Sequence, residues 1–301
     1  MKRIVLYIYL LASFLGMGQA VKFHKLGNGI NNNGYYTPVR SMFYDTIDKK
    51  LYVAGHFTQA DNKTVWGVAV WYNNMWDSLR GGFAQYPQQT PAPNEGYSSW
   101  ARKIIRYKNK VYFVGGMSYV NGKLTSGFGV WNGSNWDYPI PEMPNGNIYD
   151  LKVFNDTLYA CGLFTKFGNT TCNNIAKFDG NSWKPVGNFQ KFYKTYAPAQ
   201  INALGFFNNQ LYVGGAFSDS TGMPRNIAKF DGTKWTNVEA GIKQGGTSYV
   251  TAFEEFNAKL YIGGHFFKTN EIPGKCLVTW DGQNYNSIND NDLENSGEIF
   301  R

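Results

Sequence analysis

The chain has 301 residues, of which 17% are aromatic, 34 are glycine and only 17% are charged, a composition typical of strand-rich and turn-rich proteins. Its formal net charge is +8, but the Lys and Arg residues are scattered without a basic run. A nucleic-acid-binding surface needs clustered positive charge, so the composition argues against a nucleic-acid partner and favours, weakly, acidic ones. The length allows one large domain or two small ones.

Residues 1–20 are typical of a secretory signal peptide. Lys2 and Arg3 precede an apolar run from Ile4 to Met17, and Gly18-Gln19-Ala20 matches a small-x-small cleavage site. The run is shorter than the roughly 20 residues that span a bilayer, although an uncleaved anchor is the alternative. We therefore expect residues 21–301 to form a secreted or cell-surface protein with no membrane span and, after loss of Lys2 and Arg3, a net charge of +6.

One phrase then recurs five times and divides the chain into five units. A large aromatic residue follows each copy at an offset of 24 or 25 residues. Such phasing is the signature of a repeat architecture. The copies begin at Leu51 (LYVAGHF), Val111 (VYFVGGM), Leu158 (LYACGLF), Leu211 (LYVGGAF) and Leu260 (LYIGGHF).

Each unit reads as four short antiparallel strands, which we name a to d. In the fourth unit, strand a is Ile201–Phe207 and strand b is Leu211–Phe217. Strand c is Asn226–Phe230, Asp231-Gly232 forms a tight hairpin, and Trp235 begins strand d. Four antiparallel strands repeated at about 50 residues predict a single β-propeller domain over residues 21–301.

Two features of the units predict close packing rather than chemistry. Paired glycines in strand b, such as Gly214-Gly215, predict that a neighbouring sheet approaches closely. Aromatic residues five apart span the c–d hairpin, so their rings can lie on neighbouring strands. The pairs are Trp71/Trp76, Trp131/Trp136, Phe178/Trp183, Phe230/Trp235 and Trp280/Tyr285.

The paired glycines followed by two aromatic residues resemble the repeats of kelch and galactose-oxidase-like propellers. The longer text, LYVGGxF followed by NIAKFDGxxW, looks more like secreted propeller repeats of bacterial surface proteins and fungal cortical polarity markers. The resemblance covers roughly residues 23 to 290 and implies the fold. It implies no catalytic residue, because the His, Tyr and Cys ligands of the radical-copper site have no matching set here.

The two ends of the repeat leave two ways of closing the ring. Phe23–Ile30 aligns with Trp235–Ile242 as a strand d, and Ile299 aligns with Val250 at the start of a strand a. Five complete copies favour five blades, with the N-terminal strand completing or reinforcing the fifth sheet and displacing the degenerate strand that follows Tyr285. The alternative is an incomplete six-bladed propeller.

A polar position recurs in the otherwise apolar strand a. If these side chains face the axis, they form a ring with two guanidinium groups that suits an anion or a carboxylate sugar. The alternative is a hydrated channel without a ligand. The ring consists of Arg40, Arg102, Tyr149, Asn202 and Thr251.

Catalytic and metal-binding sets are weak. The strand-a acids Asp150, Glu254 and Glu255 do not form the carboxylate pair that glycoside hydrolysis requires. His56 and His265 occupy matching positions in the first and fifth units, but two histidines without a third ligand seldom hold a metal. We expect no metal and no cofactor.

Three cysteines and one long connection remain. Cys161 and Cys172 can bridge across a hairpin or remain buried thiols, and Cys276 makes the number odd. The b–c loops are polar and variable, as binding loops are. The connection from Phe83 to Ser99, next to Trp100, departs most from the repeat and is either a floppy insertion or a contact arm using Tyr86 and Tyr97.

These observations lead us to expect a monomeric, non-enzymatic propeller that binds a glycan or an extracellular protein through one face. A carbohydrate-active enzyme using acids on the axial face is the first alternative. A structural adhesion unit is the second.

Overall fold

The computed structural model describes residues 24–31, 39–84, 101–137, 142–195, 200–223, 225–242, 248–267 and 273–288. This part of the chain is β-structure apart from one short helix, α1 (Phe189–Phe192). The predicted all-β class is therefore confirmed. Residues 1–20, for which a signal peptide is predicted, residues 85–100 with Tyr86 and Tyr97, and Ile299 lie outside the described residues.

Each sequence unit forms one antiparallel sheet in the order a-b-c-d, and four of the five sheets have four strands. In unit 2 the fourth strand is reduced to a single bridge between Trp131 and Trp136. The strands are β2 (Val39–Asp45), β3 (Lys50–Gly55), β6 (Val68–Tyr72) and β7 (Met75–Ser78) in unit 1; β9 (Ala101–Tyr107), β10 (Lys110–Gly115) and β13 (Phe128–Trp131) in unit 2; β14 (Asn147–Phe154), β15 (Thr157–Leu163), β18 (Ile175–Phe178) and β19 (Trp183–Pro185) in unit 3; β21 (Ile201–Phe207), β22 (Gln210–Gly215), β24 (Ile227–Phe230) and β25 (Trp235–Asn237) in unit 4; and β26 (Tyr249–Phe256), β27 (Lys259–His265), β28 (Leu277–Trp280) and β29 (Tyr285–Asn286) in unit 5.

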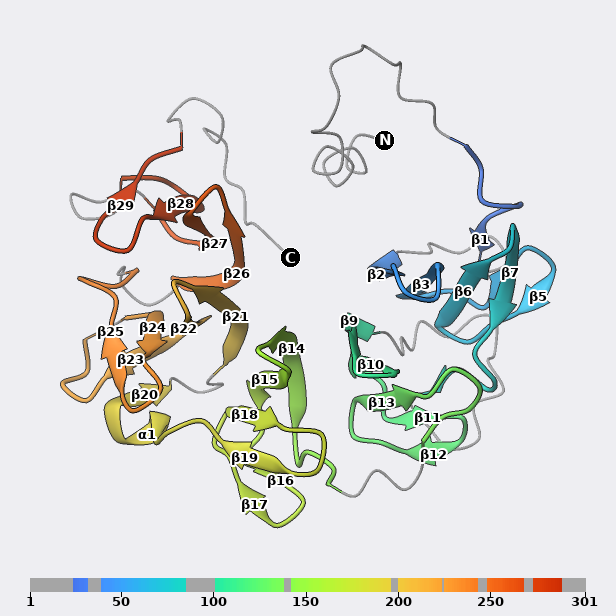
Figure 1. Ribbon diagram of the computed structural model, residues 1–301, viewed down its shortest axis with the longest axis horizontal. Helices are drawn as coiled ribbons and strands as arrows, with labels where there is room; N and C mark the ends of the chain where they lie inside the picture. Colours follow the sequence, from blue (N-terminus) through green and yellow to red (C-terminus); the bar gives the residue numbers. More distant parts are fainter. Residues whose placement is uncertain are drawn as a thin grey trace.

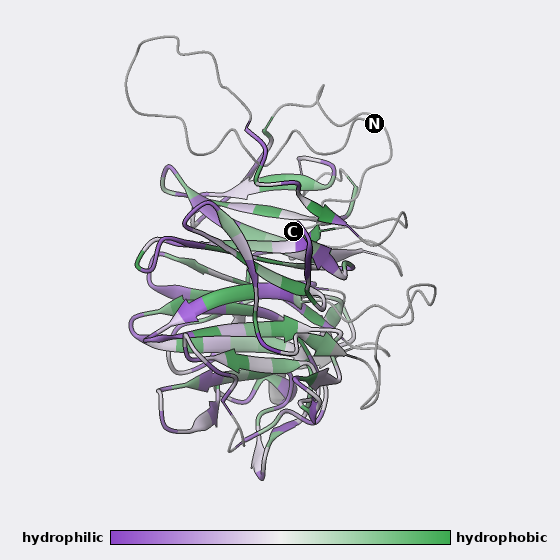
Figure 2. Ribbon diagram, turned by 90° about the vertical axis from the view of Figure 1, so that its right-hand side faces the viewer, coloured by the Kyte–Doolittle hydropathy of each residue, from purple (hydrophilic) through white to green (hydrophobic). Residues whose placement is uncertain are grey.

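The five sheets follow one another in an arc, with strand a of every unit innermost (Figure 1). The inner strands β2, β9, β14, β21 and β26 contact one another in that order. Figure 2, turned by 90°, shows the sheets stacked with hydrophobic residues along the strands and hydrophilic residues at the turns. Among the described residues, β2 and β26 end the arc on either side of an opening, which no sheet occupies.

Short strands link the outer parts of the units. The b–c loops of units 1, 2 and 3 form small hairpins. In unit 2, β11 (Tyr119–Val120) of the hairpin also pairs with β8 (Phe83–Ala84), in the chain that leaves strand d of unit 1. The loops predicted from the sequence to be polar thus contain ladders of their own. The short strands are β1 (Ile30–Asn31), β4 (Gln59–Ala60), β5 (Lys63–Thr64), β8 (Phe83–Ala84), β11 (Tyr119–Val120), β12 (Lys123–Leu124), β16 (Lys166–Phe167), β17 (Thr170–Thr171), β20 (Tyr193–Thr195) and β23 (Phe217–Asp219).

The core lies between sheets, and glycine permits the contact. A Cβ on Gly214 would lie 2.4 Å from Val250 Cγ1 and 2.8 Å from Phe253 Cε2, both in the next unit. A Cβ on Gly205 would lie 2.7 Å from Phe253 Cβ. The sequence-based explanation of the first glycine in each pair, a close approach of the neighbouring sheet, is confirmed at Gly214.

The aromatic pairs also lie as predicted. The two rings of each pair face one another across the c–d hairpin, with centroids 4.9–5.3 Å apart. Trp76, Trp183 and Trp235 are almost fully buried. These rings therefore fill the space between sheets, which explains their recurrence without a functional role.

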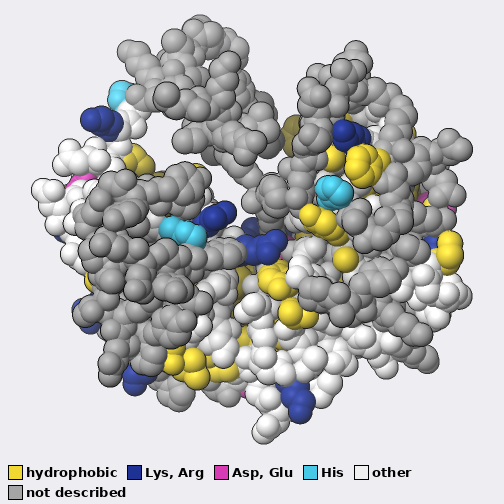
Figure 3. Space-filling view, turned by 180° about the vertical axis from the view of Figure 1, so that it is seen from behind, with side chains coloured by type: hydrophobic (Ala, Val, Ile, Leu, Met, Phe, Trp, Pro, Cys, Tyr) yellow, Lys and Arg dark blue, Asp and Glu magenta, His cyan; other side chains and the backbone are white. Residues whose placement is uncertain are grey.

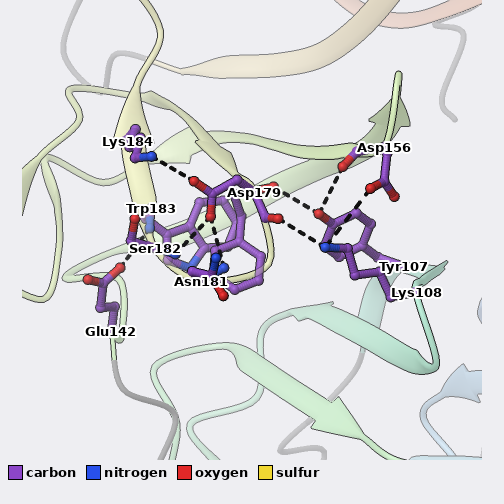
Figure 4. Close-up of polar contacts among 10 residues, drawn as sticks. Tyr107, Lys108, Glu142, Asp156, Asp179, Asn181, Ser182, Trp183 and Lys184 are labelled. Atoms are coloured by element: carbon purple, nitrogen blue, oxygen red, sulfur yellow. Dashed lines mark hydrogen bonds and ion pairs between the residues drawn. The ribbon is translucent and has the colours of Figure 1, made fainter.

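Polar contacts join the a–b turn of unit 2 to the a–b and c–d turns of unit 3 (Figure 4). Lys108 Nζ donates to the carbonyl of Asp179 at 3.0 Å, and Tyr107 Oη donates to the carbonyls of Asp156 and Phe178. The Asp179 carboxylate accepts from Lys184 Nζ and from the two turn amides drawn beside it, and these hydrogen bonds lower its pKa. This arrangement stabilises the Asp-Gly hairpin, so these charges have a structural role.

The structure corrects the expected role of the N-terminal strand. Leu26 accepts a hydrogen bond from Trp76 Nε1 at 2.9 Å, and Ile30 pairs with Ala60, so this segment lies against unit 1. The strand that begins at Tyr285 is not displaced, since Trp280 pairs with Tyr285 in register. The fifth sheet therefore has a fourth strand of its own, and the described N-terminal residues pair with unit 1 instead.

The three cysteines are free thiols and all are buried. Cys161 pairs in register with Asp150 and Ile175 inside the third sheet, while Cys172 lies among the core residues between units 2 and 3. Burial raises the pKa of the Cys172 thiol to about 11. The possible Cys161–Cys172 bridge is absent, and both residues act as small apolar side chains.

Candidate functional site at the bulges of the inner strands

All five residues of the polar ring occupy one structural position. In each inner strand the antiparallel register skips one residue, which is a β-bulge, and the skipped residue is the ring residue. A bulge bends its strand and re-aims a side chain. The bulged residues are Arg40, Arg102, Tyr149, Asn202 and Thr251.

In units 4 and 5 the second glycine of the pair makes room for this bulge. A Cβ on Gly215 would lie 2.0 Å from the Gln200 carbonyl oxygen, and one on Gly264 would lie 2.2 Å from that of Tyr249. Both carbonyls belong to the same unit, where strand a bends toward strand b. The prediction that both glycines make room for a neighbouring sheet is therefore wrong for Gly215 and Gly264, which make room for the bulge.

Neighbouring bulges contact one another across units. The Arg102 guanidinium carbon lies 5.0 Å from the centroid of the Tyr149 ring. Asn202 Nδ2 donates to the carbonyl of Val250 in the following unit at 3.4 Å. Thr251 Oγ1 donates to Gly263 O of its own sheet at 3.4 Å. Asn202 and Thr251 are therefore held within the framework, while Arg102 and Tyr149 remain partly exposed.

Positive charge collects at the unit 1 and unit 2 side of this set. Arg40 is exposed, and strands β2 and β9, which hold the two arginines, are adjacent. His56 follows strand β3 at the same end, and its pKa is lowered by burial and then by the positive charge of Arg40. On the face shown in Figure 3, Lys and Arg side chains border the central hollow. This end of the inner strands suits an anionic group.

A second set of polar residues lies three residues further along the inner strands. Lys152 Nζ forms an ion pair with Glu254 at 3.5 Å, although unit 4 separates their strands. Gly205 occupies the equivalent position of unit 4 and has no side chain that could separate Lys152 from Glu254. Lys152 was not predicted from sequence, since a single Lys in an apolar strand gives no signal until its partner is known.

Two of the three strand-a acids, Asp150 and Glu254, are engaged in structural contacts. Asp150 is fully buried, and its Oδ2 accepts a hydrogen bond at 2.9 Å from the amide of Leu204 in the next unit. Glu254 is paired with Lys152, and Glu255 lies opposite Leu260 on an exposed stretch of β26. Asp150 fastens unit 3 to unit 4, and the two glutamates point to opposite faces of their strand.

The two matching histidines lie on the two units that end the arc. His56 lies near Arg40, and the His265 ring stacks on Tyr249 with centroids 5.4 Å apart. Within the described ranges, no group of three or more His, Cys, Asp or Glu residues is arranged to hold a metal ion. The described helix is too short to span a bilayer, and no span is found in this part of the chain.

Comparisons with known proteins add no family. No family model matches the chain. No curated protein matches it significantly.

Proposed function

We propose that this protein is a secreted or cell-surface β-propeller that binds an acidic glycan at the bulge end of its inner strands and performs no catalysis. Five phased units, sheets ordered a-b-c-d and an arc of adjacent inner strands support the propeller. The sequence of residues 1–20, which resembles a signal peptide, supports the secreted or cell-surface location. The resemblance to kelch-type and secreted surface repeats agrees with both.

The observation that supports the ligand class is the position of the Arg102 guanidinium over the Tyr149 ring, 5.0 Å from its centroid, beside the strand of Arg40. Arginine can bind a carboxylate with two parallel hydrogen bonds while its guanidinium lies over an aromatic ring. An aromatic ring at the same place suits the apolar face of a sugar. Together they present a charge and a flat surface, the two elements that an acidic sugar needs.

Binding of polygalacturonate to the purified protein tests the proposal, with the fully methyl-esterified polymer as the uncharged counterpart. We expect the acidic polymer to bind and the ester to bind weakly or not at all. Arg102→Gln removes a charge-assisted hydrogen bond worth about 1.5–3 kcal/mol, which corresponds to about tenfold or more in affinity. Arg40→Gln should weaken binding in the same direction.

Lys63→Gln is the matched control, because Lys63 is an exposed cation in the b–c hairpin of unit 1, paired with Asp77. It removes the same charge away from the bulges and should leave binding within about twofold, as exposed charges contribute little. Equal effects of the three substitutions, or binding of the ester equal to that of the acid, would show that the bulges are not the site. Binding of a protein but of no acidic glycan would reassign the ligand class, and polymer cleavage lost in Glu254→Gln would favour the enzyme.

A further inference from the structure

A hydrogen bond from the strand-d aromatic ring of one unit to the preceding unit joins units 1 and 2, units 3 and 4, and units 4 and 5. Trp136 Nε1 donates to the carbonyl of Leu79, and Trp235 Nε1 donates to that of Val186, at 2.8 and 2.9 Å. Tyr285 Oη donates to the carbonyl of Val238 at 3.0 Å. In every case the acceptor lies three residues after the position of the strand-d aromatic residue in the preceding unit.

Residues 24–31 reproduce this contact on the other side of unit 1. Trp76 Nε1 donates to the carbonyl of Leu26, three residues after Phe23. The Gly29 amide donates to Leu26 O, as the Gly82 amide does to Leu79 O. The segment thus has the place and the bonds of strand d in a unit that precedes unit 1. The described residues contain no strand c beside it, because the strand c of each of the five units pairs within its own sheet.

In unit 1, the side chains that other units bury against the preceding unit lie at the opening. Val250 and Phe253 of unit 5 lie against Gly214 and Gly205 of unit 4 and are 0% and 3% exposed. Their counterparts in unit 1 are Val39 and Met42, which are 43% and 60% exposed. The counterparts of Met42 in units 2, 3 and 4 are at most 2% exposed: Ile104, Leu151 and Leu204.

Unit 5 presents the complementary side to the same opening. Phe207 and Val238 of unit 4 belong to the core shared with unit 5 and are 2% and 0% exposed. Their counterparts Phe256 and Ile288 are 45% and 41% exposed. The opening therefore has two apolar walls whose residue positions are those of an inter-unit interface.

We propose that the space between β26 and β2 is a docking site for a partner segment of three antiparallel strands. The sequence of this segment resembles strands a, b and c of the repeat, and residues 24–31 supply the fourth strand, strand d. The partner must place small residues of its strand b against Val39 and Met42, as Gly214 lies against Val250. Its strand c must offer backbone groups to the N-terminal strand, and its strand-a apolar residues must cover Phe256. This inference does not depend on the identity of the bulge ligand.

Thiol labelling at position 42 tests the proposal in the full chain. The three native cysteines are buried, so Met42→Cys supplies a distinct reactive thiol, and Leu204→Cys at the covered equivalent is the control. We expect Cys at position 42 to be labelled at least about tenfold faster than Cys at position 204, since labelling follows the population of open states. Equal protection of Cys at positions 42 and 204 in the full chain would mean that the ring closes on itself. Faster labelling at position 42 after removal of residues 289–301 would show that this tail covers it. Either result would overturn the proposal.

The second arm inserts a copy of residues 200–234 between Lys22 and Phe23, so that strands a, b and c run directly into the native strand d. We expect labelling at position 42 to slow by about tenfold or more and the thermal midpoint to rise. The control insert has Gly205 and Gly214 of the copy replaced by Leu, which blocks contact with Val39 and Met42, and should give no protection. Labelling unchanged by the first insert, or protection that rises with protein concentration without any insert, would refute the partner segment.

Discussion

The indole nitrogen of Trp235 lies 2.9 Å from the carbonyl oxygen of Val186, and this bond joins unit 4 to unit 3. Trp76 makes the same bond to Leu26, at the same distance, at the start of the arc. The two bonds differ only in their surroundings, because Val186 is buried whereas Leu26 is 38% exposed.

Trp235→Phe and Trp76→Phe should therefore have different costs. An acceptor left unpaired in a buried place costs about 1–3 kcal/mol, whereas water can replace the donor at an exposed carbonyl. We expect Trp235→Phe to lower the free energy of unfolding in urea by more than Trp76→Phe does, although both remove the same ring atoms. Equal losses would show that the ring volume alone matters.

Gly214→Ala should destabilise the protein by about 1–3 kcal/mol, the usual cost of an overpacked contact. The added Cβ meets Val250 Cγ1, so Val250→Ala in the double variant should recover part of the loss. Gly215→Ala is the matched comparison, because its Cβ meets the Gln200 carbonyl, which no side-chain truncation removes. Urea unfolding of the two glycine variants, of Val250→Ala and of the two double variants measures this coupling. Rescue of Gly215→Ala by Val250→Ala would contradict the assignment of the two glycines.

Arg40→Gln should raise the pKa of His56, which burial and the Arg40 charge lower in the native protein. Because the native pKa lies below the unfolded value of about 6.5, the unfolded state binds more protons, and stability falls as pH drops through that value. The substitution should reduce this loss. Histidine signals followed by NMR against pH measure the shift, with Arg102→Gln as a control, and an unchanged His56 titration in Arg40→Gln would contradict the prediction.

Asp231→Asn should reduce the loss of folding stability that the native protein shows as the pH falls. Hydrogen bonds from the Thr233 hydroxyl and the Lys234 and Thr233 amides lower the pKa of Asp231 to about 2. The unfolded value is about 3.9, so this contribution is complete above pH 4 and is lost as pH falls toward 2. Urea midpoints between pH 5 and 2 measure it, and Glu255→Gln, which removes a carboxylate outside the turns, should keep the native slope.

Thiol titration should find no rapidly reactive cysteine in the native protein at pH 8. Burial raises the pKa of Cys172 to about 11, and a thiol that is not ionised is a poor nucleophile. Three thiols should react after unfolding without a reductant, because no disulfide is present. Recovery of a single thiol would indicate a Cys161–Cys172 bridge.

The repeat text by itself determined the strands, their order within each unit, the c–d aromatic pairs and the interface at Gly214. These features are local or recur with a fixed phase, so periodicity and turn chemistry are enough to place them. It also singled out Arg40, Arg102 and Tyr149, since a polar residue in an apolar strand is visible without coordinates.

Only the tertiary structure decided which residues meet. The bulge is a register property between two strands, and the Lys152–Glu254 pair joins strands that are separated by a whole unit, so neither leaves a local signal. The contact of Leu26 with Trp76 likewise assigned the N-terminal strand to the side of unit 1, where alignment alone allowed either side of the opening. The phase of the repeat predicts which strand of a unit a segment forms. The packing of the sheets decides which unit that strand contacts, because the contact depends on surfaces that are distant along the chain.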